Sequence, residues 1–353
     1  MGILDFPNEL LLMVAENLSI GDLSKFRSTS QRLCLVLTPP YKQLCLEDIG
    51  TMTALQWAAV RGHVELIELA ISKGAEIDKP LGGILDKTAP RMSDRPSSVC
   101  QLANRTSVSA RTPLYLAASS GKVGAVKVLL KLGARMKCFG VRDTPAHLSA
   151  SKGDVDCMRA FIGAGFNINT RGCEDDTILH QAMYGGVEMA KYLLEHAGGD
   201  KIVNAKNSFH QTPLHLVARS FPVRYKRRVL TELLLRHGAD IHARDMIGNT
   251  PAHLAAFPGD VDTMRVLIAA GIDLKATGDH GTTILHHATR NHKGVLEYLL
   301  RQAGVRKTIH IQDNNGWTPL RRAERLGERE AVKQLVGLAQ TNKARGDCGL
   351  AAR

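Results

Sequence analysis

The sequence predicts an all-α fold made of repeated pairs of short helices, and three observations support this. A six-residue frame that opens with threonine recurs at Thr53, Thr112, Thr144, Thr177, Thr212, Thr250, Thr283 and Thr318. A glycine stands nine residues after six of these threonines, and another stands 21 residues after six of them. Apolar residues at helical spacing lie between the two glycines, as in Val261, Met264, Leu267 and Ile268.

Each position of the frame has a physical role in starting or ending a helix. Threonine is a good N-cap, because its hydroxyl accepts a free backbone N–H of the first turn. In the frame that begins at Thr250, Pro251 takes the first helical position, where its missing N–H costs nothing. His253 is placed to hydrogen-bond the capping threonine and nearby backbone. The glycines then make the turn between antiparallel helices and the left-handed end of the second helix.

The frame resembles Thr-Pro-Leu-His-x-Ala, the signature of the ankyrin repeat, whose unit is about 33 residues long. Neighbouring frames here are 32 to 38 residues apart, except for one step of 59. The resemblance implies an ankyrin-repeat solenoid of about eight helix–turn–helix repeats with β-turn fingers. We expect the first repeat at 49–79 and repeats two to eight at 112–339. The sequence that begins at Thr144 is similar to the one that begins at Thr250, 106 residues later, which indicates that a block of three repeats was duplicated.

The first 48 residues do not follow the repeat spacing and predict a separate unit of three short helices. Pro7 opens a helix whose apolar side chains keep one stripe, and Asp22 and Ser30 precede two further helical stretches. This segment, 1–48, resembles an F-box, the motif that docks on the Skp-type adaptor of cullin–RING ubiquitin ligases. The resemblance implies adaptor contacts through Phe6, Pro7, Leu10, Leu11, Val14 and Leu23. The same helices could instead only cap the exposed apolar end of the array.

Two segments are expected to lie outside the packed repeats. Residues 80–111 account for the long step between the first two frames, and their glycine, proline and serine content predicts a flexible insertion. The segment is basic, yet a solvated insertion without a function explains it as well, because long loops cost little stability. The last residues, 340–353, are expected to be a disordered tail.

Composition limits the possible functions. The formal net charge of +12 suggests an acidic partner without choosing its class. Seven cysteines without a C-x-x-C pair fit free thiols in a reducing compartment. No signal peptide and no membrane-spanning run are found, so we expect a cytoplasmic or nuclear protein. No catalytic motif, cofactor loop or metal-ligand spacing is present, and an enzyme, a cofactor and a bound metal are not expected.

The fingers that precede the frame threonines are the expected partner-binding surface, as the ankyrin resemblance implies. Their charges have mixed signs, which favours a specific protein surface over a nucleic acid. Trp317 has the residue type most often found at the centre of an interface, although tryptophan is also common at this place in the repeat. The candidate finger residues are Glu174, Asp175, His210, Met246, Asp279, His280, Asn314 and Trp317.

The fifth repeat contains five extra residues, which we expect to form a protruding basic loop between its two helices. Such a loop could contact phosphate or an acidic partner, or it could simply be a solvated charged segment. Its candidate binding residues are Arg224, Lys226, Arg227 and Arg228.

These observations favour a protein–protein interaction adaptor. The first hypothesis is the substrate-recognition subunit of a Skp–cullin–F-box ubiquitin ligase, with a Skp-type adaptor, a cullin–RING ligase and an unknown protein substrate as partners. The chain is expected to be a monomer outside that complex. The alternative is an ankyrin-repeat scaffold or regulatory binding protein without a ubiquitin role, whose N-terminal helices act only as a cap.

Overall fold

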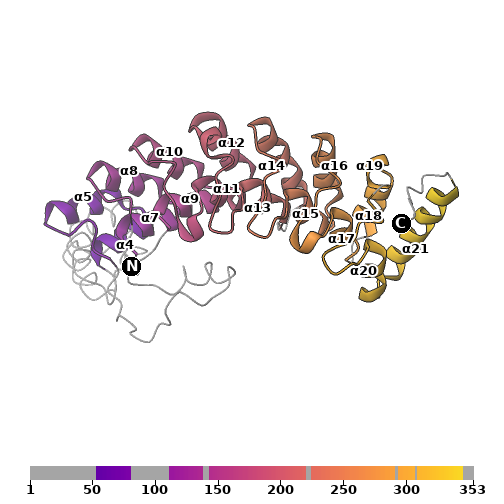
Figure 1. The fold of residues 1–353 in the computed structure, drawn as a ribbon. Helices are drawn as coiled ribbons and strands as arrows, with labels where there is room; N and C mark the ends of the chain where they lie inside the picture. Colours follow the sequence, from indigo (N-terminus) through magenta and orange to yellow (C-terminus); the bar gives the residue numbers. More distant parts are fainter. Residues whose placement is uncertain are drawn as a thin grey trace, which may run out of the picture. The chain divides into compact units, whose positions relative to one another are not determined.

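The computed structural model of the 353-residue chain describes residues 53–80, 111–137, 143–219, 224–290, 293–306 and 308–344. The predicted N-terminal unit at 1–48, with its six adaptor-binding candidates, lies outside these residues. So does nearly all of the predicted insertion at 80–111. The described part is helical, and its only β pairing is an isolated bridge between Thr277 and Thr283. The all-α prediction is therefore confirmed (Figure 1).

The chain forms two compact units, which are described separately. The N-terminal unit comprises residues 1–149 and 156–166, and the C-terminal unit comprises 150–155 and 167–353. Each of the eight frame threonines is followed by a helix pair in the described residues. The number of repeats therefore agrees with the sequence pattern.

The N-terminal unit contains the first repeats. Its first helices, α4 and α7, pack on each other, and its second helices, α5 and α8, do the same. Leu66, Leu114 and Leu129 are buried in this stack. The division between the units falls within the third pair, α9 and α10. The bounds are α4 Ala54–Arg61, α5 Val64–Ser72, α7 Pro113–Ser119, α8 Val123–Lys131, α9 Pro145–Lys152 and α10 Val155–Gly163.

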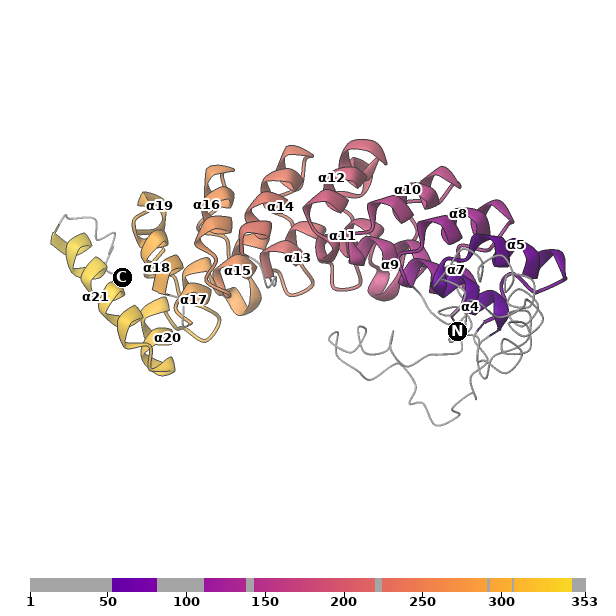
Figure 2. The same ribbon diagram turned by 180° about the vertical axis from the view of Figure 1, so that it is seen from behind.

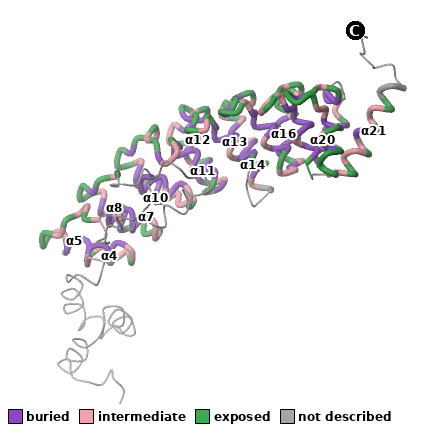
Figure 3. The backbone as a smooth tube through the Cα atoms, turned by 60° about the horizontal axis from the view of Figure 1, so that its bottom comes forward, coloured by how far each residue is buried: buried purple, intermediate pink, exposed green. Residues whose placement is uncertain are grey.

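In the C-terminal unit, the first helices of the repeats form one row and the second helices form another (Figures 1 and 2). Within the first row α11, α13, α15, α17 and α20 pack in sequence order, and α12, α14, α16 and α18 do so in the second. Buried residues are found along the helices of both rows, and many exposed residues lie at the turns (Figure 3).

The bounds of the first row are α11 Ile178–Gly185, α13 Pro213–Arg219, α15 Pro251–Ala256, α17 Ile284–Ala288 and α20 Pro319–Leu326. The second helices are α12 Val187–His196, α14 Arg224–Arg236, α16 Val261–Ala269, α18 Lys293–Leu300 and α21 Arg329–Ala344. Short helices complete the unit: η5 Cys173–Asp175, η6 Gly199–Ile202, η7 Asp279–Gly281 and α19 Ala303–Arg306.

A threonine–histidine pair starts the first helix in four repeats of the C-terminal unit. At Thr283, the backbone N–H donates to His286 Nδ1 at 3.0 Å, and the two side chains are 2.8 Å apart. His286 Nε2 then donates to the Trp317 carbonyl of the next repeat at 2.9 Å. The same arrangement joins His180 to Gln211, His215 to Asn249 and His253 to Ala276. The predicted role of the histidine is confirmed.

Three details differ from the sequence predictions. Helix α21 continues through Ala344, so residues 340–344 of the predicted disordered tail are helical. This stretch has no glycine or proline, and Thr341 donates to the Leu338 carbonyl within the helix. Gly304 was expected to end a helix but lies inside α19. Cys173 is disulfide-bonded, so the expectation of free thiols is wrong there, whereas Cys157 is free and buried.

The prediction of a basic loop in the fifth repeat is wrong, because residues 224–228 form the first turn of α14. That helix has 13 residues, against nine in α16, so the insertion lengthens the helix instead of widening the turn. Arginine and lysine are good helix formers, and no glycine or proline follows Pro222 in this stretch. Arg227 is buried, and its guanidinium lies 3.1 Å from the Asp260 carboxylate, so it faces the protein and not a partner.

Arg227 and Arg228 provide a matched pair for testing this correction. We expect Arg227→Ala to lower the free energy of unfolding by about 3 kcal/mol, because the buried Asp260 charge would lose its cationic partner and keep only its hydrogen bonds from Thr263. Arg228 is exposed and pairs only with Glu232 on the same helix, so Arg228→Ala should change stability little. Urea denaturation of both variants measures the difference. Equal effects would contradict the buried ion pair.

Removal of one bridging histidine should destabilise the stack. We expect His286→Ala to cost about 2 kcal/mol, because the Trp317 carbonyl loses one of its two donors and the Thr283 N–H loses its acceptor. His310 is exposed, so His310→Ala is the control and should change stability by less than about 0.5 kcal/mol. Chemical denaturation followed by circular dichroism compares them, and indistinguishable midpoints would refute the bridging role.

Stability should also fall as the pH drops below neutrality. Burial lowers the pKa of His253 from 6.5 to about 4. Burial lowers the pKa of His287 to about 3, helped by the nearby charges of His253 and Arg322. The folded chain thus binds fewer protons than the unfolded chain between pH 6.5 and 4. For each of these two histidines, the free energy of unfolding should fall by up to about 1.4 kcal/mol per pH unit as the pH falls through this window.

Urea denaturation of the native chain between pH 6.5 and 5 measures this slope, in a range where most carboxylates remain ionised. The double variant His253→Gln/His287→Gln should show a shallower pH dependence, even if its stability at pH 7 is lower. An unchanged slope would mean that these two histidines are not held neutral by the fold.

Candidate functional site

Three fingers of the C-terminal unit are built around a buried polar side chain. Asp245 Oδ1 accepts the backbone N–H groups of Ile247 and Asn249, at 3.1 and 2.8 Å. Asn207 and Asp313 make the equivalent bonds in their fingers. An Asp or Asn side chain that bonds its own backbone in this way fixes a turn. The residues at the tip are therefore held in place without using their own side chains.

The turn of each finger needs a left-handed residue two positions before the threonine. Glycine fills this position in three fingers, with φ of 86° at Gly248 and similar values at Gly281 and Gly316. Asp175 and His210 fill it in two others, with φ of 63° and 55°. A non-glycine side chain at positive φ is uncommon, and backbone strain of this kind clusters at functional sites. At Asp175 and His210, a side chain is therefore present although glycine would avoid the backbone strain.

Backbone hydrogen bonds join consecutive fingers into one surface. The N–H groups of Ser208, Met246 and Asn314 donate to carbonyls of the preceding finger at 2.8–2.9 Å, namely those of Glu174, Phe209 and His280. The N–H of Asp279 donates to Asn249 Oδ1 at 2.9 Å. Arg244 adds a bridge, because one guanidinium nitrogen donates to the carbonyls of Gly248 and Thr277. The five fingers thus form a continuous hydrogen-bonded ladder.

The predicted finger candidates lie along this ladder. Met246 is 60% exposed and its neighbour Ile247 is 51% exposed. His210, Asp175, Asn314 and His280 are also exposed, while Glu174 and Asp279 are half-buried. His280 Nε2 lies 3.4 Å from Asp279 Oδ1. Trp317 is half-buried, and the Arg325 guanidinium sits 4.7 Å from the centre of its ring.

The structure reveals a second row of exposed side chains that sequence analysis did not single out. These residues stand seven positions after the frame threonine, near the end of each first helix, and form what we term the inner stripe. Reading the frames one below another at this position would have shown the alternation of aromatic residues and arginine. The inner stripe consists of Tyr184, Arg219, Phe257, Arg290 and Arg325.

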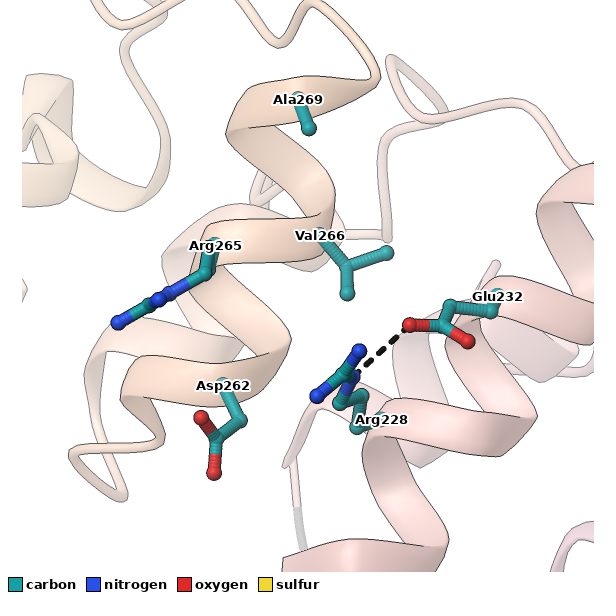
Figure 4. A pocket seen from close by; sticks show the side chains of 6 residues that line it. All are labelled: Arg228, Glu232, Asp262, Arg265, Val266 and Ala269. Carbon is teal, nitrogen blue, oxygen red and sulfur yellow. Dashed lines mark hydrogen bonds and ion pairs between the residues drawn. The ribbon is translucent and has the colours of Figure 1, made fainter.

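A pocket of about 300 Å³ lies between α14 and α16, lined in part by Arg228 and Glu232 (Figure 4). The Arg228 guanidinium pairs with Glu232 at 2.9 Å across its wall. Asp262 and Arg265 also line it. Charges of both signs therefore meet in this pocket. The basic candidates Arg224, Lys226, Arg227 and Arg228 belong to helix α14 instead of the predicted loop between the two helices.

No group of three or more histidine, cysteine, aspartate or glutamate side chains in the described ranges is placed to hold a metal ion. Among the described helices, none is long and apolar enough to cross a membrane. The geometry is that of a surface which presents side chains to another molecule.

Comparisons with known proteins agree with this geometry. The family model described as "Ankyrin repeats (3 copies)" matches residues 33–139, 91–172, 136–205, 223–311 and 277–345. The crystal structure of the human ASB11 ankyrin repeat domain covers 70% of this chain and 97% of that domain, with a TM-score of 0.52 at 22% identity. At this identity the likeness speaks for the fold.

Two curated relatives share the repeats within longer proteins. The putative palmitoyltransferase ZDHHC13 of Danio rerio is 27% identical over 76% of this chain, but the match covers 32% of that protein. Ankyrin repeat domain-containing protein 63 of Mus musculus is 30% identical over 46% of this chain and 41% of its own length. The chain thus spans less than half the length of these relatives. Because the family model matches most of the sequence, and each frame starts a helix pair, the chain belongs to the ankyrin-repeat family.

Proposed function

We propose that the chain is the substrate-recognition subunit of a Skp–cullin–F-box ubiquitin ligase, in which the ankyrin repeats hold the protein substrate. The observation that carries the substrate side of this proposal is the finger ladder of the C-terminal unit. It presents two adjacent apolar side chains, Met246 and Ile247, on a turn whose backbone is held by the buried Asp245 side chain. A preorganised surface of this kind binds with little loss of conformational freedom.

Both apolar residues favour a protein as the partner. Met246 and Ile247 are large and more than half exposed, and burying such side chains in an interface contributes about 25 cal/mol per Å² of apolar area. Methionine also adapts its shape to a partner surface. Asp175 and His210, whose backbones have positive φ, lie in the two fingers that precede the finger of Met246. Their side chains would add polar contacts.

The adaptor side of the proposal rests on the N-terminal sequence. Phe6-Pro7-Asn8-Glu9-Leu10, followed by Val14, Leu18 and Asp22-Leu23, is similar to the F-box pattern. In this proposal the segment binds a Skp-type adaptor, and the cullin–RING ligase and its conjugating enzyme carry out the transfer of ubiquitin. The chain contributes proximity and orientation, and it works in the cytoplasm or the nucleus.

A second function is an ankyrin-repeat scaffold without a ubiquitin role. The apolar end of any repeat array needs a cap, and residues 1–48 could serve only that purpose. The two functions differ in what the N-terminal segment contacts. In the first, Pro7 and Leu10 affect adaptor binding; in the second, they affect the stability of the repeats.

A pulldown of the full chain with a purified Skp-type adaptor tests the proposal. We expect the native chain to bind, and the variant Pro7→Ala/Leu10→Ser to lose binding while keeping its circular dichroism spectrum and melting temperature. The matched control is Met246→Ser, which alters a finger and should bind the adaptor as the native chain does. Failure of the folded native chain to bind refutes the ligase role. A lower melting temperature in the double variant with adaptor binding retained would instead indicate a cap.

A further inference from the structure

The inner stripe repeats one position of the frame across five consecutive first helices. These helices, from α11 to α20, pack in sequence order, so the five side chains follow one another across the row. Tyr184 and Phe257 are 44% and 46% exposed, and the three arginines are exposed as well. The order is therefore aromatic, cationic, aromatic, cationic, cationic.

Two arginines of this region are held in place by aromatic rings. The Arg290 guanidinium lies over the Phe257 ring, 5.2 Å from its centre, and the Arg325 guanidinium lies over Trp317 at 4.7 Å. Stacking of a guanidinium on a ring leaves the N–H groups at its edge available for hydrogen bonds. These edges can bind a carboxylate through two parallel bonds.

The stripe is positively charged and has few carboxylates of its own. Helices α11, α13, α15 and α17 contain no aspartate or glutamate. Within the described part of the chain, no carboxylate forms an ion pair with Arg219, Arg290 or Arg325. Three exposed cations therefore share one face without an ion pair to any carboxylate of the described residues.

The cations gather most closely at the end of the stripe. Arg322 is half-buried next to Arg290, and its pKa is lowered first by burial and then by the charge of Arg290, against an opposing effect of Asp313. Asp313 is buried and accepts two backbone N–H bonds within its finger. An anionic group placed between Arg290, Arg322 and Arg325 would relieve this repulsion.

We infer that the inner stripe binds an extended acidic peptide segment of a protein partner, a conclusion that rests on the protein-binding role proposed above but not on the ligase role. Packed helices lie about 10 Å apart, and a peptide in the extended polyproline II conformation advances about 3.1 Å per residue with three residues per turn. Every third side chain of such a peptide therefore points to the same side and meets the next repeat. From α11 to α20, these residues would be apolar, acidic, apolar, acidic and acidic, in either chain direction.

A peptide fits the stripe better than a single-stranded nucleic acid does. Sequence-tolerant binding of nucleic acids depends on open aromatic faces on which bases stack, whereas guanidinium groups already cover one face of Phe257 and Trp317. A peptide offers separate apolar and acidic side chains that can match each position.

Fluorescence anisotropy with the full chain tests this inference. The probe is a labelled synthetic peptide with leucine, glutamate, leucine, glutamate and glutamate at every third position and serine and threonine between them. A second peptide has the same composition but carries these residues in the order glutamate, leucine, glutamate, leucine and glutamate, so that four of the five positions are mismatched. The third probe is an oligothymidylate of equal charge. We expect the affinity of the first peptide to be higher than that of the other two probes by about tenfold or more. Its affinity should fall as the salt concentration rises.

Matched charge variants identify the site. Arg290→Gln/Arg325→Gln should weaken the first peptide by about tenfold or more, because two charge-assisted contacts are lost. The control Arg228→Gln/Arg265→Gln removes the same charge from exposed positions of α14 and α16, including an arginine 5.4 Å from the Tyr298 ring, and should bind normally. Both variants should retain the adaptor binding of the native chain, so the outcome is independent of the ligase role.

Three results would overturn the inference: equal binding of the two peptides, equal weakening by both charge variants, or preferential binding of the oligothymidylate. The last result would identify the stripe as a nucleic-acid surface. Loss of adaptor binding by the native chain, with peptide selectivity intact, would reject the ligase role and leave the inference standing.

Discussion

The hydrogen bonds of one buried histidine in each of four frames join consecutive repeats of the C-terminal unit. Nδ1 accepts from the threonine that starts the first helix, and Nε2 donates to a carbonyl in the following repeat or in the segment that leads to it. Both bonds are made at once only by the neutral tautomer with its proton on Nε2. Since the pKa of His253 and His286 is lowered mainly by burial, burial maintains the protonation state that the bonds require.

This interaction also determines where the fingers lie. His286 bonds to the carbonyl of Trp317, directly before the next frame threonine, and His180 bonds to that of Gln211 in the same way. The histidines of α11, α13 and α17 therefore position the end of the next finger. The fingers are further joined by backbone bonds and by the side chains of Arg244 and Asn249, so the other exposed side chains are free to vary without weakening the ladder. The stability of the array and its binding specificity are thus carried by different groups of atoms.

The sequence predicted the features that depend on local interactions. A capping threonine, a first-turn proline and a positive-φ glycine act within a few residues, so the frames located all eight helix pairs. Prediction from the sequence failed where a residue far along the chain determines which contacts a side chain makes. Arg227 looks like a surface charge until Asp260, more than 30 residues later, is found 3.1 Å away. The inner stripe was missed for a similar reason, because its residues become neighbours only when the first helices stack.

The duplicated block separates the residues that build the array from those that are free to bind. Thr144 and His147 recur unchanged 106 residues later as Thr250 and His253, and the next pair recurs as Thr283 and His286. The position seven residues after the threonine differs in two of the three pairs: Ser151 and Tyr184 correspond to Phe257 and Arg290, whereas Arg219 recurs as Arg325. Two copies with the same packing tolerate different side chains there, so packing does not determine those residues. The aromatic and cationic order of the stripe therefore requires an explanation outside the fold, and an acidic peptide partner supplies one.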